Sequence, residues 1–133
     1  MGTVSGNPDG GGGEGVRRVL VVDDDPMVAT AVAEYLEATS ERLEVVHTTA
    51  PTAALERLDG SFDCVVTDYE MPRLDGLSLI ERAETDAEFV VFSGADDDSV
   101  GRRARERGAA FVPKGVDTGQ YEQLAAVVGE QVT

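Results

Sequence analysis

Residues 64–76 read CVVTDYEMPRLDG, in which a short apolar run ends in a threonine and an aspartate. The run CVV is rich in β-branched residues, as strands buried on both faces of a sheet tend to be. Similar runs occur at 19–22 (VLVV), 43–46 (LEVV), 89–92 (FVVF) and 110–112 (AFV). The chain is therefore expected to contain five short, buried strands.

Helical patterns separate these runs, near 26–39, 51–59, 74–84, 98–108 and 118–131. Pro26 suits the first turn of the first helix, and Gly60 and Gly108 stand where helices are expected to stop. Strands that alternate with helices imply a parallel sheet with helices on both faces, and the right-handed crossover rule favours a doubly wound sheet. We expect a single α/β domain over 16–133, preceded by a disordered Gly-rich tail over 1–15.

The charge balance excludes some partners. The chain of 133 residues has 26 acidic and 11 basic side chains and a net charge of −15, which argues against direct binding to nucleic acid or an anionic membrane. Lys114 is the only lysine, and such an acidic, lysine-poor composition resembles that of proteins from halophilic microbes.

Cysteine and histidine are too scarce for several kinds of site. One of each is present, Cys64 and His47, so an internal disulfide, a thiolate cage and a His-rich zinc site are excluded. No apolar run approaches the roughly 20 residues of a membrane span, and the N-terminus has no apolar signal core. We therefore expect a cytoplasmic protein.

Polar side chains follow four of the five predicted strands: Asp23-Asp24-Asp25, Thr67-Asp68, Ser93-Gly94 and Pro113-Lys114. Ligands of open α/β sheets bind at the carboxyl ends of the strands, so these residues are expected to share one edge. Carboxylates without histidine or cysteine favour Mg²⁺ or Mn²⁺, and Mg²⁺ completes its shell with phosphate oxygens. The sequence thus predicts a site prepared for a phosphoryl group.

The acids of this edge suit different tasks. A carboxylate can act as a nucleophile and form an aspartyl-phosphate, and Asp68, alone on its strand end, is the better candidate. The neighbouring pair Asp23 and Asp24 is better suited to hold the metal ion. Lys114 would supply a positive charge to the phosphoryl group, and Ser93 a hydroxyl donor.

Four segments together resemble the receiver domain of two-component response regulators: 19–26 (VLVVDDDP), 64–76, 89–94 (FVVFSG) and 108–114 (GAAFVPK). The pattern D-x-x-M-P-x-x-D-G within 64–76 is the most specific of them. The resemblance implies a flavodoxin-like (βα)5 fold with strand order 2-1-3-4-5. It also implies that Asp68 accepts a phosphoryl group from a sensor histidine kinase.

The resemblance implies further roles at matching positions. Mg²⁺ would be bound by Asp23, Asp24, Asp68 and the backbone carbonyl of Glu70. Ser93 and Lys114 would contact the phosphoryl group, and Ser93 and Phe111 would form the conformational switch. The signalling surface would lie on the fourth helix, fifth strand and fifth helix.

Two departures from the family pattern leave open questions. Gly115 follows Lys114 where family members usually have proline, so the shape of that loop is in doubt. Glu70 lies two residues after Asp68. Its charge would either lengthen the lifetime of the aspartyl-phosphate by repelling hydroxide or shorten it by orienting a water molecule.

The predicted fourth helix carries a basic patch, formed by Arg102, Arg103, Arg105 and Arg107. The patch is either a solvated helix face or a docking site for an acidic partner.

Three functions remain in competition. The first is a stand-alone phosphoacceptor switch rather than an enzyme. It would be monomeric or dimerise on phosphorylation, and would signal through contact with an unknown downstream protein. The second is a small Mg²⁺-dependent phosphohydrolase with Asp23 or Asp25 as nucleophile. The third is a degenerate receiver that binds partners without phosphorylation.

Overall fold

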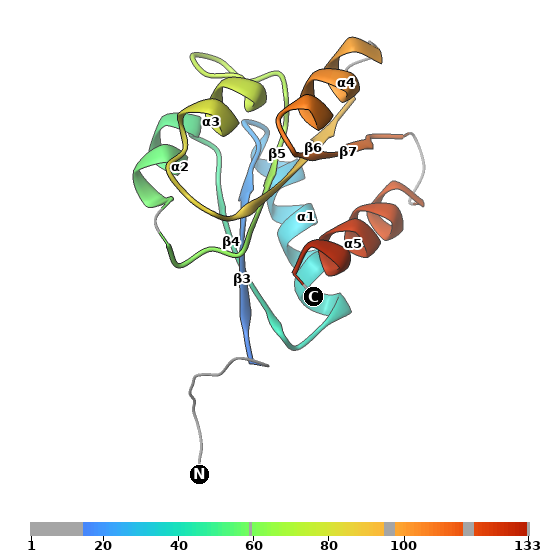
Figure 1. The fold of residues 1–133 in the computed structure, drawn as a ribbon. Coiled ribbons are helices and arrows are strands. Elements are labelled where there is room, and N and C mark those ends of the chain that lie inside the picture. Colours follow the sequence, from blue (N-terminus) through green and yellow to red (C-terminus); the bar gives the residue numbers. More distant parts are fainter. Residues whose placement is uncertain (1–14, 59, 95–97, 116–118, 133) are drawn as a thin grey trace.

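Five parallel strands form the centre of the computed structural model, which describes residues 15–58, 60–94, 98–115 and 119–132 (Figure 1). Gly15 alone of the predicted tail lies among the described residues. The strands are β3 (Arg17–Val22), β4 (Leu43–Thr48), β5 (Cys64–Thr67), β6 (Glu88–Ser93) and β7 (Ala110–Pro113). Their order in the sheet, β4-β3-β5-β6-β7, confirms the predicted order 2-1-3-4-5.

Helices cover both faces of this sheet, as Figure 1 shows. They are α1 (Pro26–Thr39), α2 (Pro51–Arg57), α3 (Gly76–Arg82), α4 (Asp98–Glu106) and α5 (Gly119–Gln131). Helices α1 and α5 pack on one face, and α2, α3 and α4 on the other. Within the described part of the chain, no helix is long and apolar enough to cross a membrane.

The two hydrophobic cores explain why the strands are apolar at successive positions. Leu20 and Val22 of β3 pack in the core beneath α2, α3 and α4. Val19 and Val21 pack in the core beneath α1 and α5. Because alternate side chains of a strand point to opposite faces, a sheet covered on both sides needs apolar residues at both sets of positions.

The stop of α2 differs from the prediction. The helix ends at Arg57, and Leu58, which follows it, is only 7% exposed and donates its backbone N–H to the Ala54 carbonyl. Burial of Leu58 turns the chain out of the helix before Gly60, so the prediction of a stop at Gly60 is wrong. The stop at Gly108 is confirmed: its φ is +80°, a conformation that suits glycine, and its N–H donates to the Arg105 carbonyl.

Cys64 is a buried small hydrophobe. Its side chain lies in β5 between two neighbouring strands and is 0% exposed. Burial, with smaller contributions from the charges of Glu88 and Asp63, raises the pKa of the thiol to about 12. Cys64 therefore remains a protonated thiol at neutral pH.

Candidate functional site

The register of the sheet brings the carboxyl ends of the strands level. Val22 pairs with Thr67, and the backbone ladder continues one residue further, because the N–H of Asp68 donates to the Val22 carbonyl at 3.0 Å. At the other side of the sheet, the N–H of Lys114 donates to the Ser93 carbonyl at 2.9 Å. Asp23, Asp68 and Lys114 are thus the first residues beyond strands that end at the same edge.

Three carboxylates gather at this edge. Asp23, Asp24 and Asp68 each offer one oxygen, and these oxygens lie within 4.8 Å of one another. Asp23 is only 4% exposed, whereas Asp24 is exposed and Asp68 is half-buried. Carboxylates this close repel one another unless a cation lies among them, and oxygen donors without nitrogen or sulfur suit Mg²⁺ or Mn²⁺. The donor set therefore fits the predicted metal ion.

Glu70 does not extend this cluster with its side chain. Its carboxylate is not among the three that converge, and the residue is exposed. The predicted role of its backbone carbonyl in metal binding stays a prediction.

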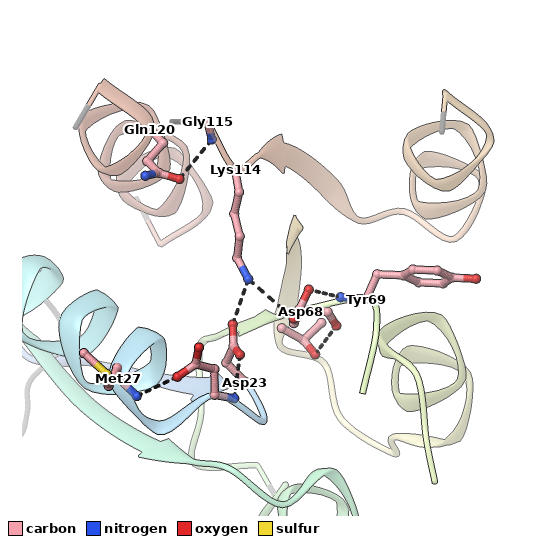
Figure 2. Close-up of polar contacts among 9 residues, drawn as sticks. Asp23, Met27, Asp68, Tyr69, Lys114, Gly115 and Gln120 are labelled. Carbon is pink, nitrogen blue, oxygen red and sulfur yellow. Dashed lines mark hydrogen bonds and ion pairs between the residues drawn. The ribbon is translucent and has the colours of Figure 1, made fainter. Parts of the chain in front are cut away.

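Lys114 reaches from the end of β7 into the acidic cluster, as Figure 2 shows. Its Nζ lies 3.0 Å from Oδ2 of Asp23 and 3.4 Å from Oδ2 of Asp68. Burial by itself lowers the pKa of this amine, but the hydrogen bond to Asp23 and the charge of Asp68 outweigh it and leave the pKa raised. Lys114 is therefore charged at neutral pH.

Asp68 holds its two carboxylate oxygens in different surroundings. Oδ1 accepts a hydrogen bond of 2.7 Å from the backbone N–H of Tyr69. Oδ2 faces Lys114. One oxygen is thus fixed by the backbone, while the other lies on the side where the acids and the lysine meet (Figure 2).

Asp25 stands beside the cluster as a helix cap. Its Oδ1 accepts a hydrogen bond of 2.9 Å from the N–H of Met27 at the start of α1. Its own backbone N–H donates to Oδ1 of Asp23, also at 2.9 Å. Asp25 therefore caps α1 with its side chain and orients Asp23 with its backbone N–H.

The loop from Asp68 to Gly76 folds back on its own beginning. The N–H of Gly76 donates to the Tyr69 carbonyl at 2.9 Å, and the Asp75 side chain caps α3 by accepting from the N–H of Ser78. A Cβ at Gly76 would lie 2.2 Å from the backbone oxygen of Asp68. These contacts give the last two residues of the D-x-x-M-P-x-x-D-G pattern a structural reason.

The two residues assigned to the switch lie in neighbouring strands. Ser93 ends β6 and is 1% exposed, and Phe111 lies in the adjacent β7. The Phe111 ring packs against α4 where Gly101 has no side chain, since a Cβ there would lie 3.3 Å from the ring. The switching role of Ser93 and Phe111 stays a prediction.

Two arginines of the basic patch make contacts that the sequence did not reveal. The Arg103 guanidinium lies 5.9 Å from the centroid of the Tyr69 ring, next to Asp68. Arg107 forms an ion pair with Glu81 of α3. The patch is therefore partly engaged within the molecule, and α4 is tied to the loop that carries Asp68. The sequence gives no signal for these contacts, because they depend on how close α4 lies to α3 and to the loop after β5.

The burial of Asp23 leads to a pH-dependent prediction. Burial raises the pKa of this carboxyl, although the Asp25 N–H and the ammonium of Lys114 oppose the shift. Below the ordinary pKa of aspartic acid, the carboxyl is neutral in both the folded and the unfolded chain. As the pH rises through the raised pKa, the folded protein ionises a buried group and loses stability relative to a variant without the charge.

We therefore expect Asp23→Asn to unfold at higher urea concentration than the wild type at pH 7 in a chelating buffer. The difference should shrink as the pH falls towards 3. The control is Asp86→Asn, which makes the same charge change at an exposed position. An Asp23→Asn advantage that is absent at pH 7, or equal to that of the control, would contradict the assignment of burial as the dominant cause.

Comparisons with known proteins place this geometry in a family. A family model described as "Response regulator receiver domain" matches residues 19–126. The transcriptional regulatory protein FlgR of Helicobacter pylori is 35% identical over 77 residues, which cover 58% of this chain and 20% of that protein. A protein-glutamate methylesterase/protein-glutamine glutaminase of Cereibacter sphaeroides is 36% identical over 121 residues, which cover 86% of this chain and 33% of that protein. The chain thus spans a fifth to a third of these curated relatives.

Solved structures show the same fold. A response regulator receiver domain protein from Clostridium thermocellum superimposes with a TM-score of 0.75 at 21% identity, over 88% of this chain and 94% of that one. The signal receiver domain of a Luxo repressor protein from Vibrio parahaemolyticus gives a TM-score of 0.77 at 16% identity, over 88% and 90% of the two chains. With the family model covering most of its length, the chain belongs to the response regulator receiver domains.

Proposed function

We propose that this receiver accepts one phosphoryl group on Asp68 from the phosphohistidine of a sensor histidine kinase, in a Mg²⁺-dependent reaction. The observation that carries the proposal is the position of Lys114, whose Nζ lies 3.4 Å from Oδ2 of Asp68 and 3.0 Å from Oδ2 of Asp23. The ammonium group is thus ready to pair with negative charge added at Asp68.

The transfer forms one bond and breaks one. A carboxylate oxygen of Asp68 attacks the phosphorus, the bond from phosphorus to the imidazole nitrogen breaks, and that nitrogen leaves with its electron pair and takes up a proton. Lys114 balances the charge that gathers on the phosphoryl oxygens. Ser93, at the end of β6, would donate its hydroxyl to one of them.

Asp23, Asp24, Asp68 and the carbonyl of Glu70 would hold the Mg²⁺ ion. When bound, the ion neutralises the carboxylates and the phosphoryl oxygens, which otherwise repel one another. The Asp25 N–H and Lys114 hold the two oxygens of Asp23 in place around that site.

Phosphorylation would be read out on the surface of α4, β7 and α5. Phe111 of β7 packs against Gly101 of α4, and Ser93 lies on the adjacent strand β6, where it pairs with Pro113 two residues after Phe111. A change at Ser93 would reach the surface through β7. An unknown downstream protein would bind there by protein–protein contact, to a monomeric or a dimeric receiver. The net charge of −15 disfavours direct contact with nucleic acid or an anionic membrane. We place the proposed switch in the cytoplasm.

The geometry favours Asp68 over the nucleophiles of the phosphohydrolase alternative. Oδ1 of Asp25 is engaged in capping α1. Both oxygens of Asp23 accept hydrogen bonds, one from the Asp25 N–H and one from Lys114. Asp68 has one oxygen fixed by the Tyr69 N–H, and its other oxygen lies 3.4 Å from Lys114 Nζ, where the ammonium can pair with negative charge added at Asp68.

Incubation with a small phosphodonor, such as acetyl phosphate, distinguishes the three functions. We expect one Mg²⁺-dependent label per chain that is stable in acid and released by hydroxylamine, as an acyl phosphate should be. Hydrolysis of many phosphoesters per chain, unchanged in Asp68→Asn, would favour the phosphohydrolase instead. A chain that takes up no label at any Mg²⁺ concentration would be a degenerate receiver. Parallel reactions in molar KCl test whether the acidic composition is an adaptation to high salt. Salt screens repulsion among surface acids, so an adapted protein should label at least as well there as in dilute buffer.

A further inference from the structure

The backbone on either side of Lys114 is held by two hydrogen bonds of different kinds. The N–H of Lys114 donates to the Ser93 carbonyl, which continues the sheet. The next N–H, that of Gly115, donates to Oε1 of the Gln120 side chain at 3.0 Å. Gln120 lies in the first turn of α5, and Figure 2 shows its amide turned towards Gly115.

The first turn of α5 also packs against Phe92, the ring that lies beneath the end of the Lys114 side chain. The Nζ of Lys114 lies 5.5 Å from the centroid of the Phe92 ring. The Tyr121 ring packs on Phe92 with a centroid distance of 6.2 Å. Gln120 and Tyr121 are adjacent, so one helical turn contacts the chain that follows Lys114 and supports the ring beneath its ammonium group.

Gly115 contributes no side chain that could fix its position. Glycine has the widest conformational freedom of the residues, and a Cβ at this position would meet nothing within 4 Å. Within the described ranges, the hydrogen bond to the Gln120 oxygen is therefore what holds the backbone directly after Lys114.

We propose that Gln120 is a positioning residue for Lys114, acting through its hydrogen bond to the Gly115 backbone. The inference rests on the proposed function, because it assigns Lys114 to the phosphoryl group. Without the acceptor, the end of β7 moves more freely, and the ammonium group spends less time facing Oδ2 of Asp68. Removing a hydrogen bond of ordinary strength should slow labelling of Asp68 by about threefold to tenfold.

The test compares two substitutions of similar size. Gln120→Met removes the acceptor, whereas Gln120→Glu keeps an oxygen that can accept from Gly115. We expect slower labelling by acetyl phosphate at saturating Mg²⁺ in Gln120→Met and a wild-type rate in Gln120→Glu. The Mg²⁺ dissociation constant should change far less than in a variant without the Lys114 ammonium, since Gln120 is not among the acids and Lys114 keeps its charge. Gln123→Met, an exposed substitution on the same helix, is the matched control.

A double-mutant cycle isolates the contact. Gly115→Pro removes the N–H, so Gln120→Met should have no further effect on the labelling rate in that background. Equal rates for Gln120→Met and the wild type, or equal losses in Gln120→Met and Gln120→Glu, would overturn the proposal. So would full additivity of Gly115→Pro and Gln120→Met.

A second readout does not depend on phosphorylation. Because Lys114 is the only lysine, lysine labelled with ¹³C at Cε gives a single NMR signal from this side chain. Its order parameter should fall in Gln120→Met and stay at the wild-type value in Gln120→Glu and Gln123→Met. An unchanged order parameter in Gln120→Met would overturn the positioning role even if the wild type failed to label. Failure of the wild type to label would count against the proposed function alone.

Discussion

Gly76→Ala is expected to lower the free energy of unfolding by about 3 kcal/mol, at the upper end of the range for overpacked sites. The added Cβ would lie 2.2 Å from the backbone oxygen of Asp68, 3.1 Å from its carbonyl carbon and 3.2 Å from Cα of Tyr69. All three are backbone atoms, so no flexible side chain can move aside. Either α3 or the end of β5 must shift, and the hydrogen bond from the Gly76 N–H to Tyr69 weakens with it.

Urea unfolding checks this expectation, with Gly129→Ala as the matched control. Gly129 lies inside α5, and a Cβ there meets nothing within 4 Å. Alanine in a helix interior is favoured over glycine by about 0.5–1 kcal/mol, so the control should be more stable than the wild type. Gly76→Ala should also label more slowly, because the clash falls on Asp68 itself. A Gly76→Ala protein as stable as the wild type would show that the loop does not fold back as described.

Lys114→Met is expected to change metal binding and phosphorylation in opposite directions. The ammonium group lies within hydrogen-bonding distance of Asp23 and near Asp68, and it competes with a divalent cation for the same carboxylates. Two unit charges about 4 Å apart interact by about 4 kcal/mol at an effective dielectric near 20, and salt removes part of this. If about a third of this interaction survives the screening, its loss in Lys114→Met should lower the Mg²⁺ dissociation constant by about tenfold.

The same substitution should slow labelling at Asp68 by about tenfold to a hundredfold, the range for loss of a hydrogen bond to a charged group. Isothermal titration with MgCl₂ measures the first effect, and acetyl phosphate labelling at saturating Mg²⁺ measures the second. Arg107→Met is the control, because it makes the same change in net charge at an ion pair with Glu81 on another part of the surface. Weaker Mg²⁺ binding in Lys114→Met, or equal effects in Arg107→Met, would contradict the account.

The strands and the convergence of the site could be predicted from the sequence because both follow from local rules. The β-branched runs at 19–22 and 64–66 are apolar at successive positions, as strands of a sheet covered on both faces tend to be. Parallel strands end at one edge, so the first polar residue after each, such as Asp23 or Asp68, is placed by the topology alone.

Contacts between side chains from distant segments were beyond the same rules. Nothing in the spacing of Gly115 and Gln120 indicates that an amide oxygen accepts from that backbone N–H. The contact of Arg103 with Tyr69 likewise depends on the distance between α4 and the loop after β5. Such contacts are set by how the helices pack on the sheet, which the pattern of apolar residues determines only coarsely.

Backbone geometry was predicted only where glycine signalled it. Gly108 takes the positive φ expected after a helix, whereas Arg73 takes a φ of 75° without any signal in its residue type. The predicted end of α2 at Gly60 was wrong because a glycine does not always mark the end of a helix. Burial of Leu58 outweighed the turn preference of Gly60 two residues later.

The most direct test of the central claim is to identify the residue that carries the phosphoryl group. Protein labelled by acetyl phosphate with Mg²⁺ is reduced with borohydride, which converts an aspartyl-phosphate to homoserine, and its peptides are sequenced by mass spectrometry. We predict homoserine at position 68, and none at position 23, 24 or 25. Homoserine at one of those three positions, or none anywhere in protein that carries the label, would contradict the assignment of Asp68 as the acceptor.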